Sequence, residues 1–248
     1  IKSFFTKINL IVLLLIYPLS IIFYLDEDFN TYYLPYLTYL ESSKIVFGLV
    51  NLNDALVLSQ NTLYDIYVFF KLPYLVEKGY SIVGVSFLFF FLSFLFFQIK
   101  SNSFQENIFL FIVIIISVST FDKLRDMGAA IPAQLLMIIS MVLIFMIINS
   151  KIHVQHIVLV LFYFLFAFLL RINAIIILPF IFLIFIIHYK YLYDLFLRFK
   201  LFISFNIVIF SLFIIKNLIL TGCIIYPIYF SCFENNFKWS ASVDKSIT

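Results

Sequence analysis

The sequence is poor in charge and in glycine. Of its 248 residues only 12% are Asp, Glu, Lys or Arg, and five are Gly. No glycine-rich phosphate-binding loop is present, and neither the G-x-x-x-x-G-K-[ST] nor the G-x-S-x-G pattern occurs. The net charge of +3 is small and scattered along the chain. These shortages argue against nucleotide hydrolysis and against nucleic acid as a partner.

Apolar residues are in excess. They make up 65% of the chain, with 35 Phe and 16 Tyr, and the mean hydropathy is +1.14. A soluble domain of this size cannot bury so much apolar surface. The sequence therefore predicts an all-α fold, a polytopic transmembrane helix bundle in a single domain (1–248), with the lipid bilayer as its surroundings. The chain begins at Ile1 and stops after a polar stretch, so we expect the N-terminal part of a longer protein.

Seven apolar segments approach the roughly 20 residues that a transmembrane helix needs. They lie near 8–25, 80–98, 107–121, 133–149, 156–170, 174–189 and 202–220. Only Arg171 and Asn173 interrupt the apolar stretch that holds the fifth and sixth segments. This spacing predicts a tight hairpin with Arg171 at its turn.

The distribution of Lys and Arg over the short loops favours a cytoplasmic N-terminus. The long connection 26–79 then forms the first outer loop, which carries amphipathic or interfacial helices. The loop around 121–132, the Arg171 turn and the stretch 221–233 fall on the same outer side. Ionisable residues that converge at one membrane face predict a functional site there.

Three acids follow the first apolar segment directly: Asp26, Glu27 and Asp28. A carboxylate at this place could serve as the base in a group transfer, and Asp28 is the first candidate. The alternative is a helix N-cap, because Asp readily accepts backbone N–H bonds. Asp26 and Asp28 also form a D-x-D pattern that could hold a divalent ion such as Mg²⁺ or Mn²⁺ through oxygen ligands, or they are solvated surface acids.

The next outer loop combines both signs of charge. Asp126 is a second candidate carboxylate, and Lys123 and Arg125 could clamp phosphate oxygens. The alternative is a self-paired surface turn. Arg171 lies between two apolar segments and needs a partner, which is either a lipid phosphate or one of these acids.

The two cysteines, Cys223 and Cys232, lie nine residues apart in the last outer stretch. They form a disulfide if that stretch faces an oxidising compartment, and remain two thiols otherwise. The sequence alone leaves both alternatives open.

Two stretches resemble a known family. DFNTYYLPYL, residues 28–37, is similar to the first outer loop of GT-C-class integral membrane glycosyltransferases, including the bacterial mannosyl- and arabinosyltransferase type. Asp28, Tyr32, Leu34 and Pro35 match, whereas Tyr33 stands where His is frequent. KNLILTGCIIYPIYF, residues 216–230, resembles the K-N-x-x-x-(S/T)-G-x-x-x-Y-P segment that closes the last helix of such cores. The matching residues are Lys216, Asn217, Thr221, Gly222, Tyr226 and Pro227.

The resemblance implies a bacterial inner-membrane enzyme whose site faces the periplasm or exterior. Its donor would be a polyprenyl-phosphate-linked sugar, and its acceptor a glycan, a lipid or a protein of the cell envelope. Asp28 would be the catalytic base and Asp126 the second acid, with Tyr32 in substrate binding. Arg171, from its place between two apolar segments, is the candidate that holds the donor phosphate. No soluble cofactor is implied, and a divalent ion stays open. A flippase or transporter of lipid-linked sugars, or a glycan polymerase, is the alternative function.

Overall fold

The computed structural model describes most of the chain after residue 130 and shorter stretches before it. The described residues are 10–12, 14, 31, 34–43, 46–52, 57, 89–95, 108, 110–115, 130–149, 154–233 and 237–241. The helices with described bounds are α2 (Leu34–Ser43), η3 (Leu49–Asn51), α7 (Ala130–Asn149), α8 (Val154–Leu170), η6 (Ile172–Ile177), α9 (Leu178–Ile187), α10 (Tyr189–Arg198), α11 (Lys200–Thr221) and η7 (Tyr229–Ser231). Within these ranges the regular structure is helical, with one isolated β-bridge, so the predicted all-α class is confirmed.

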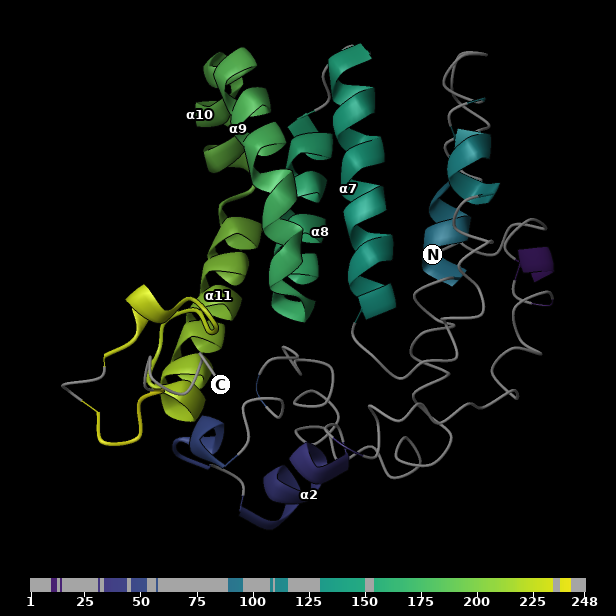
Figure 1. Ribbon diagram of the computed structural model, residues 1–248. Helices are drawn as coiled ribbons and strands as arrows, with labels where there is room; N and C mark the ends of the chain where they lie inside the picture. The colour runs from purple at the N-terminus through teal and green to yellow at the C-terminus, as the bar shows by residue number, and fades with distance from the viewer. Residues whose placement is uncertain are drawn as a thin grey trace.

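The helices of the C-terminal half form a bundle (Figure 1). α7 packs along α8, η6 packs on both, α9 contacts α7, and α11 contacts α8. Leu143, Ile147 and Ile157 are among the fully buried side chains between them. The four predicted apolar segments from residue 133 onward lie in these helices, and a helix satisfies the backbone polar groups of an apolar run within the run itself.

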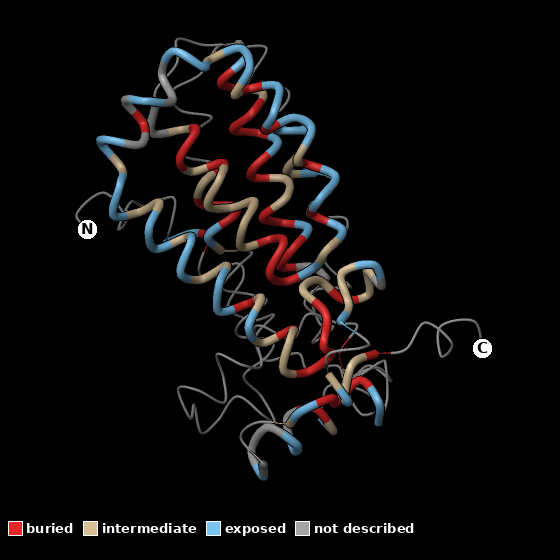
Figure 2. Tube along the Cα trace, turned by 90° about the vertical axis from the view of Figure 1, so that its left-hand side faces the viewer, coloured by how far each residue is buried: buried red, intermediate tan, exposed pale blue. Residues whose placement is uncertain are grey.

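The outer surface of the bundle is also apolar. Figure 2 shows exposed residues all along the outer helices, and Ile186, Leu201 and Leu212 are examples with large aliphatic side chains. A helix that is apolar on every side lies in a large core or in lipid. The exposed faces of α9 and α11 have the composition that hydrocarbon favours.

The prediction of seven spans is not supported. Among the described residues, α11 is the helix that is both long enough and apolar enough to cross a membrane. The apolar helical stretches Pro132–Ile148, His156–Leu170 and Ile172–Ile187 are shorter. The last of these opens with 3-10 turns, which divide the sixth predicted segment. The predicted segments 8–25, 80–98 and 107–121 lie largely outside the described residues.

The chain turns at Arg171, as the sequence predicted, and α9 beyond the turn contacts α7. The Arg171 backbone is extended (φ −155, ψ 126) between α8 and η6, and its N–H closes the last turn of α8 on the Ala167 carbonyl at 2.8 Å. η6 then packs back onto α8. Ala167 and Ala174 are fully buried there, and such small side chains allow helix backbones to approach closely.

Candidate functional site

The last turn of α11 is a meeting point of segments that are far apart in the sequence. The Gly48 N–H donates to the Ile219 carbonyl at 3.0 Å, and the Ala241 N–H donates to the Thr221 carbonyl at 2.8 Å. The predicted first outer loop and the chain after α11 therefore both attach to this helix end. We call residues 47–51, 216–223 and 237–241 the α11 junction.

Gly222 ends α11. Its backbone is left-handed (φ 72), and its N–H donates to the Leu218 carbonyl at 3.0 Å, which is the usual C-terminal turn of a helix. A Cβ at this position would lie 2.6 Å from the Ser240 Cα. The glycine is thus needed both for the turn and for the passage of residue 240 across the helix end.

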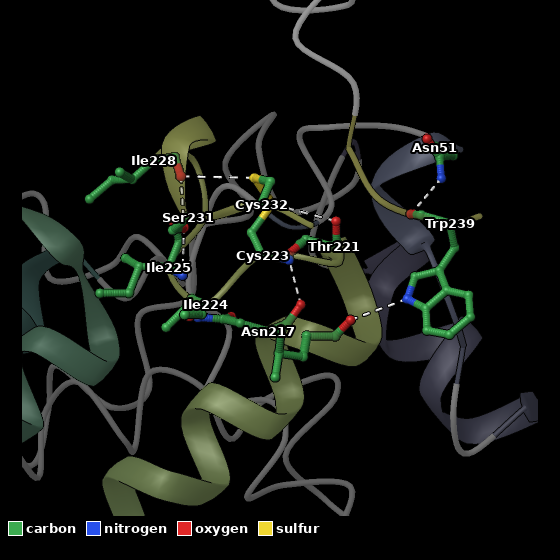
Figure 3. The surroundings of a disulfide bond; sticks show 11 residues. Asn51, Asn217, Thr221, Cys223, Ile224, Ile225, Ile228, Ser231, Cys232 and Trp239 are labelled. Atoms are coloured by element: carbon green, nitrogen blue, oxygen red, sulfur yellow. Dashed lines mark hydrogen bonds between the residues drawn. A yellow bond between two sulfur atoms is a disulfide. The ribbon is translucent and has the colours of Figure 1, made fainter. Parts of the chain in front are cut away.

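Side chains of the motif-like stretch fix the same turn (Figure 3). The Asn217 Nδ2 donates to the Ile224 carbonyl at 3.2 Å, and the Thr221 hydroxyl donates to the Asn217 carbonyl at 2.7 Å. The Thr221 Oγ1 in turn accepts the Cys223 N–H at 3.1 Å. Asn217 and Thr221 are both buried, and their side chains find hydrogen-bond partners in the backbone of this turn.

Cys223 and Cys232 form a disulfide, so the bridged alternative is the correct one. The backbone pairs on both sides of it: the Ile224 N–H donates to the Ser231 carbonyl and the Phe233 N–H to the Gly222 carbonyl, each at 3.0 Å. Within this loop the Tyr226–Pro227 peptide is cis. The disulfide loop is therefore anchored to the end of α11 by covalent and hydrogen bonds.

Trp239 joins the two distant segments. Its indole N–H donates to the Leu218 carbonyl at 3.2 Å, and its own carbonyl accepts the Asn51 Nδ2 at 2.8 Å. Its ring meets Phe47 edge-on at 5.2 Å. Gly48, with φ 65, leaves the space, because a Cβ there would approach the Trp239 Cβ to 2.5 Å. A role for Trp239 was not predicted from the sequence. The one signal for it is that Trp239 is the single Trp among the 248 residues.

Lys216 reaches the other helix of the first outer loop. Its Nζ lies 5.9 Å from the ring centroid of Tyr36, at a distance typical of a cation–π contact. Tyr36 is 1% exposed. Tyr36 belongs to the run DFNTYYLPYL and Lys216 opens the run KNLILTG, so the two stretches that resemble one family touch each other.

Arg171 is the one predicted site residue within the described ranges. It is exposed at the end of α8. Leu170 beside it packs in one apolar cluster with Phe213 of α11 and Ile225 of the disulfide loop. Arg171 therefore lies at the end of the bundle that carries the α11 junction.

The other predicted site residues lie outside the described ranges. They are Asp26, Asp28, Tyr32, Lys123, Arg125 and Asp126. Over the part of the chain that the structure does describe, no group of three His, Cys, Asp or Glu could hold a metal ion. The predicted ligands Asp26 and Asp28 are not part of that search.

Comparison with models of protein families identifies the family of this chain. The model of a family described as a domain of unknown function (DUF8201) matches residues 1–247, so the chain belongs to that family. Curated proteins and solved structures give no match.

Proposed function

We propose that this DUF8201 protein is an integral membrane glycosyltransferase, which moves a sugar from a polyprenyl-phosphate donor to a cell-envelope acceptor. The observation that carries the proposal is the contact between Tyr36 and Lys216, with the Gly48–Ile219 hydrogen bond beside it. Two short sequence likenesses that arose by chance have no reason to meet in space. Two parts of one transferase core would meet.

The membrane placement of the proposal is supported by the helices. α11 is long and apolar enough to span, and α7, α8 and α9 carry almost continuous apolar sequence. Large aliphatic side chains such as Leu201 and Leu212 are exposed on α11. In water such a surface would drive aggregation, whereas in lipid it has no cost.

In the proposed reaction the Asp28 carboxylate takes the proton of the acceptor hydroxyl. The hydroxyl oxygen forms the new bond to the anomeric carbon, and the bond from that carbon to the phosphate oxygen breaks with inversion. The polyprenyl phosphate leaves with the electron pair, and the exposed Arg171 would stabilise its charge. Asp126 would orient the acceptor, with Lys123 and Arg125 on the phosphate.

Asp26 and Asp28 would hold a divalent ion such as Mg²⁺ or Mn²⁺ through their carboxylate oxygens, and such an ion would supply positive charge near the leaving phosphate. Tyr32 would line the same site. A lipid-linked leaving group needs no soluble cofactor.

The test is sugar transfer by the full-length protein in vesicles. Polyprenyl-phosphate mannose, arabinose, glucose and galactose, each radiolabelled, are offered with cell-envelope extract as acceptor. We expect one donor to give labelled acceptor and free polyprenyl phosphate. Movement of intact donor across the bilayer would instead identify a flippase, and repeated extension of one lipid-linked glycan a polymerase. Either result would contradict the proposal.

A further inference from the structure

α10 differs from the helices on either side of it. Its sequence YKYLYDLFLR carries Lys190, Asp194 and Arg198 at intervals of four, whereas α9 has no charged residue at all. Residues four apart share one face of a helix, so these positions form one polar stripe. The predicted segments 174–189 and 202–220 leave this stretch as a connection on the side of the N-terminus, and a helix was not predicted there.

One residue on each side separates α10 from α9 and from α11. His188 (φ −115, ψ 26) and Phe199 (φ −113, ψ 24) both leave helical geometry. Their N–H groups still close the preceding helices, on the Ile184 carbonyl at 2.9 Å and on the Leu195 carbonyl at 3.0 Å. α10 is thus a distinct helix held at both ends, at the upper end of the bundle in Figure 1 and away from the α11 junction.

One side of α10 faces the bundle and another side is exposed. Leu195 is 1% exposed and packs in the main core, but Tyr189, Tyr193 and Leu197 are all exposed, with Tyr193 at 72%. These three are also four apart, and at about 100° per residue their stripe runs beside the polar stripe. The free surface of α10 therefore has an aromatic and aliphatic strip along a cationic one.

The cations on this surface outnumber the acids. Lys190, Arg198 and Lys200 are exposed, and Asp194 is the single acid in the sequence from 189 to 200. The Lys190 Nζ lies 5.9 Å from the centroid of the Tyr189 ring, so charge and ring are adjacent.

The surface of α10 continues the apolar surfaces of the two helices that it joins. Ile186 and Ile187 are exposed at the end of α9, and Leu201 (82%) and Phe205 are exposed at the start of α11. Along this surface, exposed aliphatic side chains are followed by Tyr and then by Lys and Arg. A bilayer presents the matching order, from acyl chains to the interface and then to the headgroups.

We propose that α10 is an interfacial helix that binds anionic phospholipid headgroups. Leu197 lies among acyl chains, Tyr189 and Tyr193 lie at headgroup depth, and Lys190, Arg198 and Lys200 contact the phosphates. A phospholipid fits better than a soluble anion, because a soluble anion would leave the aromatic and aliphatic strip in water.

The leaflet is the cytoplasmic one. Cation-rich connections stay on the cytoplasmic side, where anionic lipid attracts them. The disulfide at the opposite end of the bundle agrees, because disulfides persist in oxidising compartments. The inference rests on the membrane placement of the proposed function and not on sugar transfer.

A fluorescent residue on α10 tests the inference. Tyr193→Trp is placed in the full-length protein in nanodiscs, with nitroxide-labelled phosphatidylglycerol or labelled phosphatidylcholine at equal mole fraction. The same protein without this substitution gives the background, to which Trp239 contributes as the one Trp of these 248 residues. We expect labelled phosphatidylglycerol to quench the new Trp several-fold more strongly than labelled phosphatidylcholine.

Removal of the cations provides the second arm. In the Tyr193→Trp background, the triple variant Lys190→Gln, Arg198→Gln and Lys200→Gln should abolish the preference for phosphatidylglycerol. Each cation near an anionic surface strengthens binding to that surface roughly fivefold. Lys238→Gln is the matched control, because Lys238 is exposed in the α11 junction, and it should leave the preference intact.

Three outcomes would overturn the inference. They are equal quenching by both lipids, absence of quenching by either lipid, and loss of the preference on addition of millimolar inorganic phosphate, which would identify a soluble anion. Failure of the transferase proposal leaves these readouts unchanged, so the two proposals fail separately.

Discussion

Gly48 and Gly222 have positive φ, and both lie against the segment 239–240. They are two of only five glycines in the chain. The family resemblance singled out Gly222. The role of Gly48 and Trp239 could not be predicted, because Asn51 and Trp239 meet across 188 residues and no local pattern encodes such a pairing.

At this scale Gly222→Ala should lower the stability of the protein by about 2 kcal/mol. A left-handed alanine costs roughly 1 to 2 kcal/mol, and the new Cβ would also press on Ser240. Thermal unfolding in nanodiscs measures the loss. Ser211→Ala is the control, because Ser211 is an exposed residue of α11 that bonds only to its own helix. A Gly222→Ala melting curve that matches the control would contradict the account.

Among the elements, the long apolar runs were predictable and the polar helix was not. α7, α8 and α11 match the predicted segments to within a few residues, because an uninterrupted apolar run leaves few alternatives to helix. α10 was missed because it falls between two predicted spans, 174–189 and 202–220, in a stretch taken as a connection, although its residues do repeat with the period of a helix. Among the described residues the predicted number of spans is not supported, because the run divided by Arg171 and 3-10 turns yields shorter helices.

The disulfide loop offers the test at this scale. Replacing Cys223 and Cys232 together by Ser should cost about 2 to 3 kcal/mol, the value for a short closed loop. Because the loop and the segment 237–241 share the end of α11, the Gly48 amide, bonded to Ile219, should also exchange hydrogen faster. Unchanged exchange at Gly48 would show that the disulfide does not support the junction. Reduction of the native protein is the control and should reproduce both effects.

The described part of the molecule has two chemically different ends. One carries the disulfide, Arg171 and the contact between Tyr36 and Lys216, and the other carries the cations of α10. The sequence predicted that the outer loops, the Arg171 turn and the stretch 221–233 lie on one outer face. The described residues of these segments do lie at one end of the bundle. The acids Asp28 and Asp126 are outside the described residues, so their place at this end stays a prediction.

Sidedness follows from this division. A cysteine at Lys238 should react with a membrane-impermeant maleimide in intact cells, and a cysteine at Tyr193 only after permeabilisation. The native cysteines are bridged and do not compete for the reagent. Labelling of the Tyr193 position in intact cells would reverse the orientation and remove the periplasmic site.

The most direct test of the central claim compares Asp28→Asn with Asp26→Asn in sugar transfer by the full-length protein. General base catalysis contributes about 10²- to 10⁴-fold to a rate. The account predicts that Asp28→Asn lowers turnover by at least about 10²-fold while binding of the polyprenyl-phosphate donor is retained, and that Asp26→Asn has a much smaller effect. Turnover by Asp28→Asn at the rate of the native protein would contradict it.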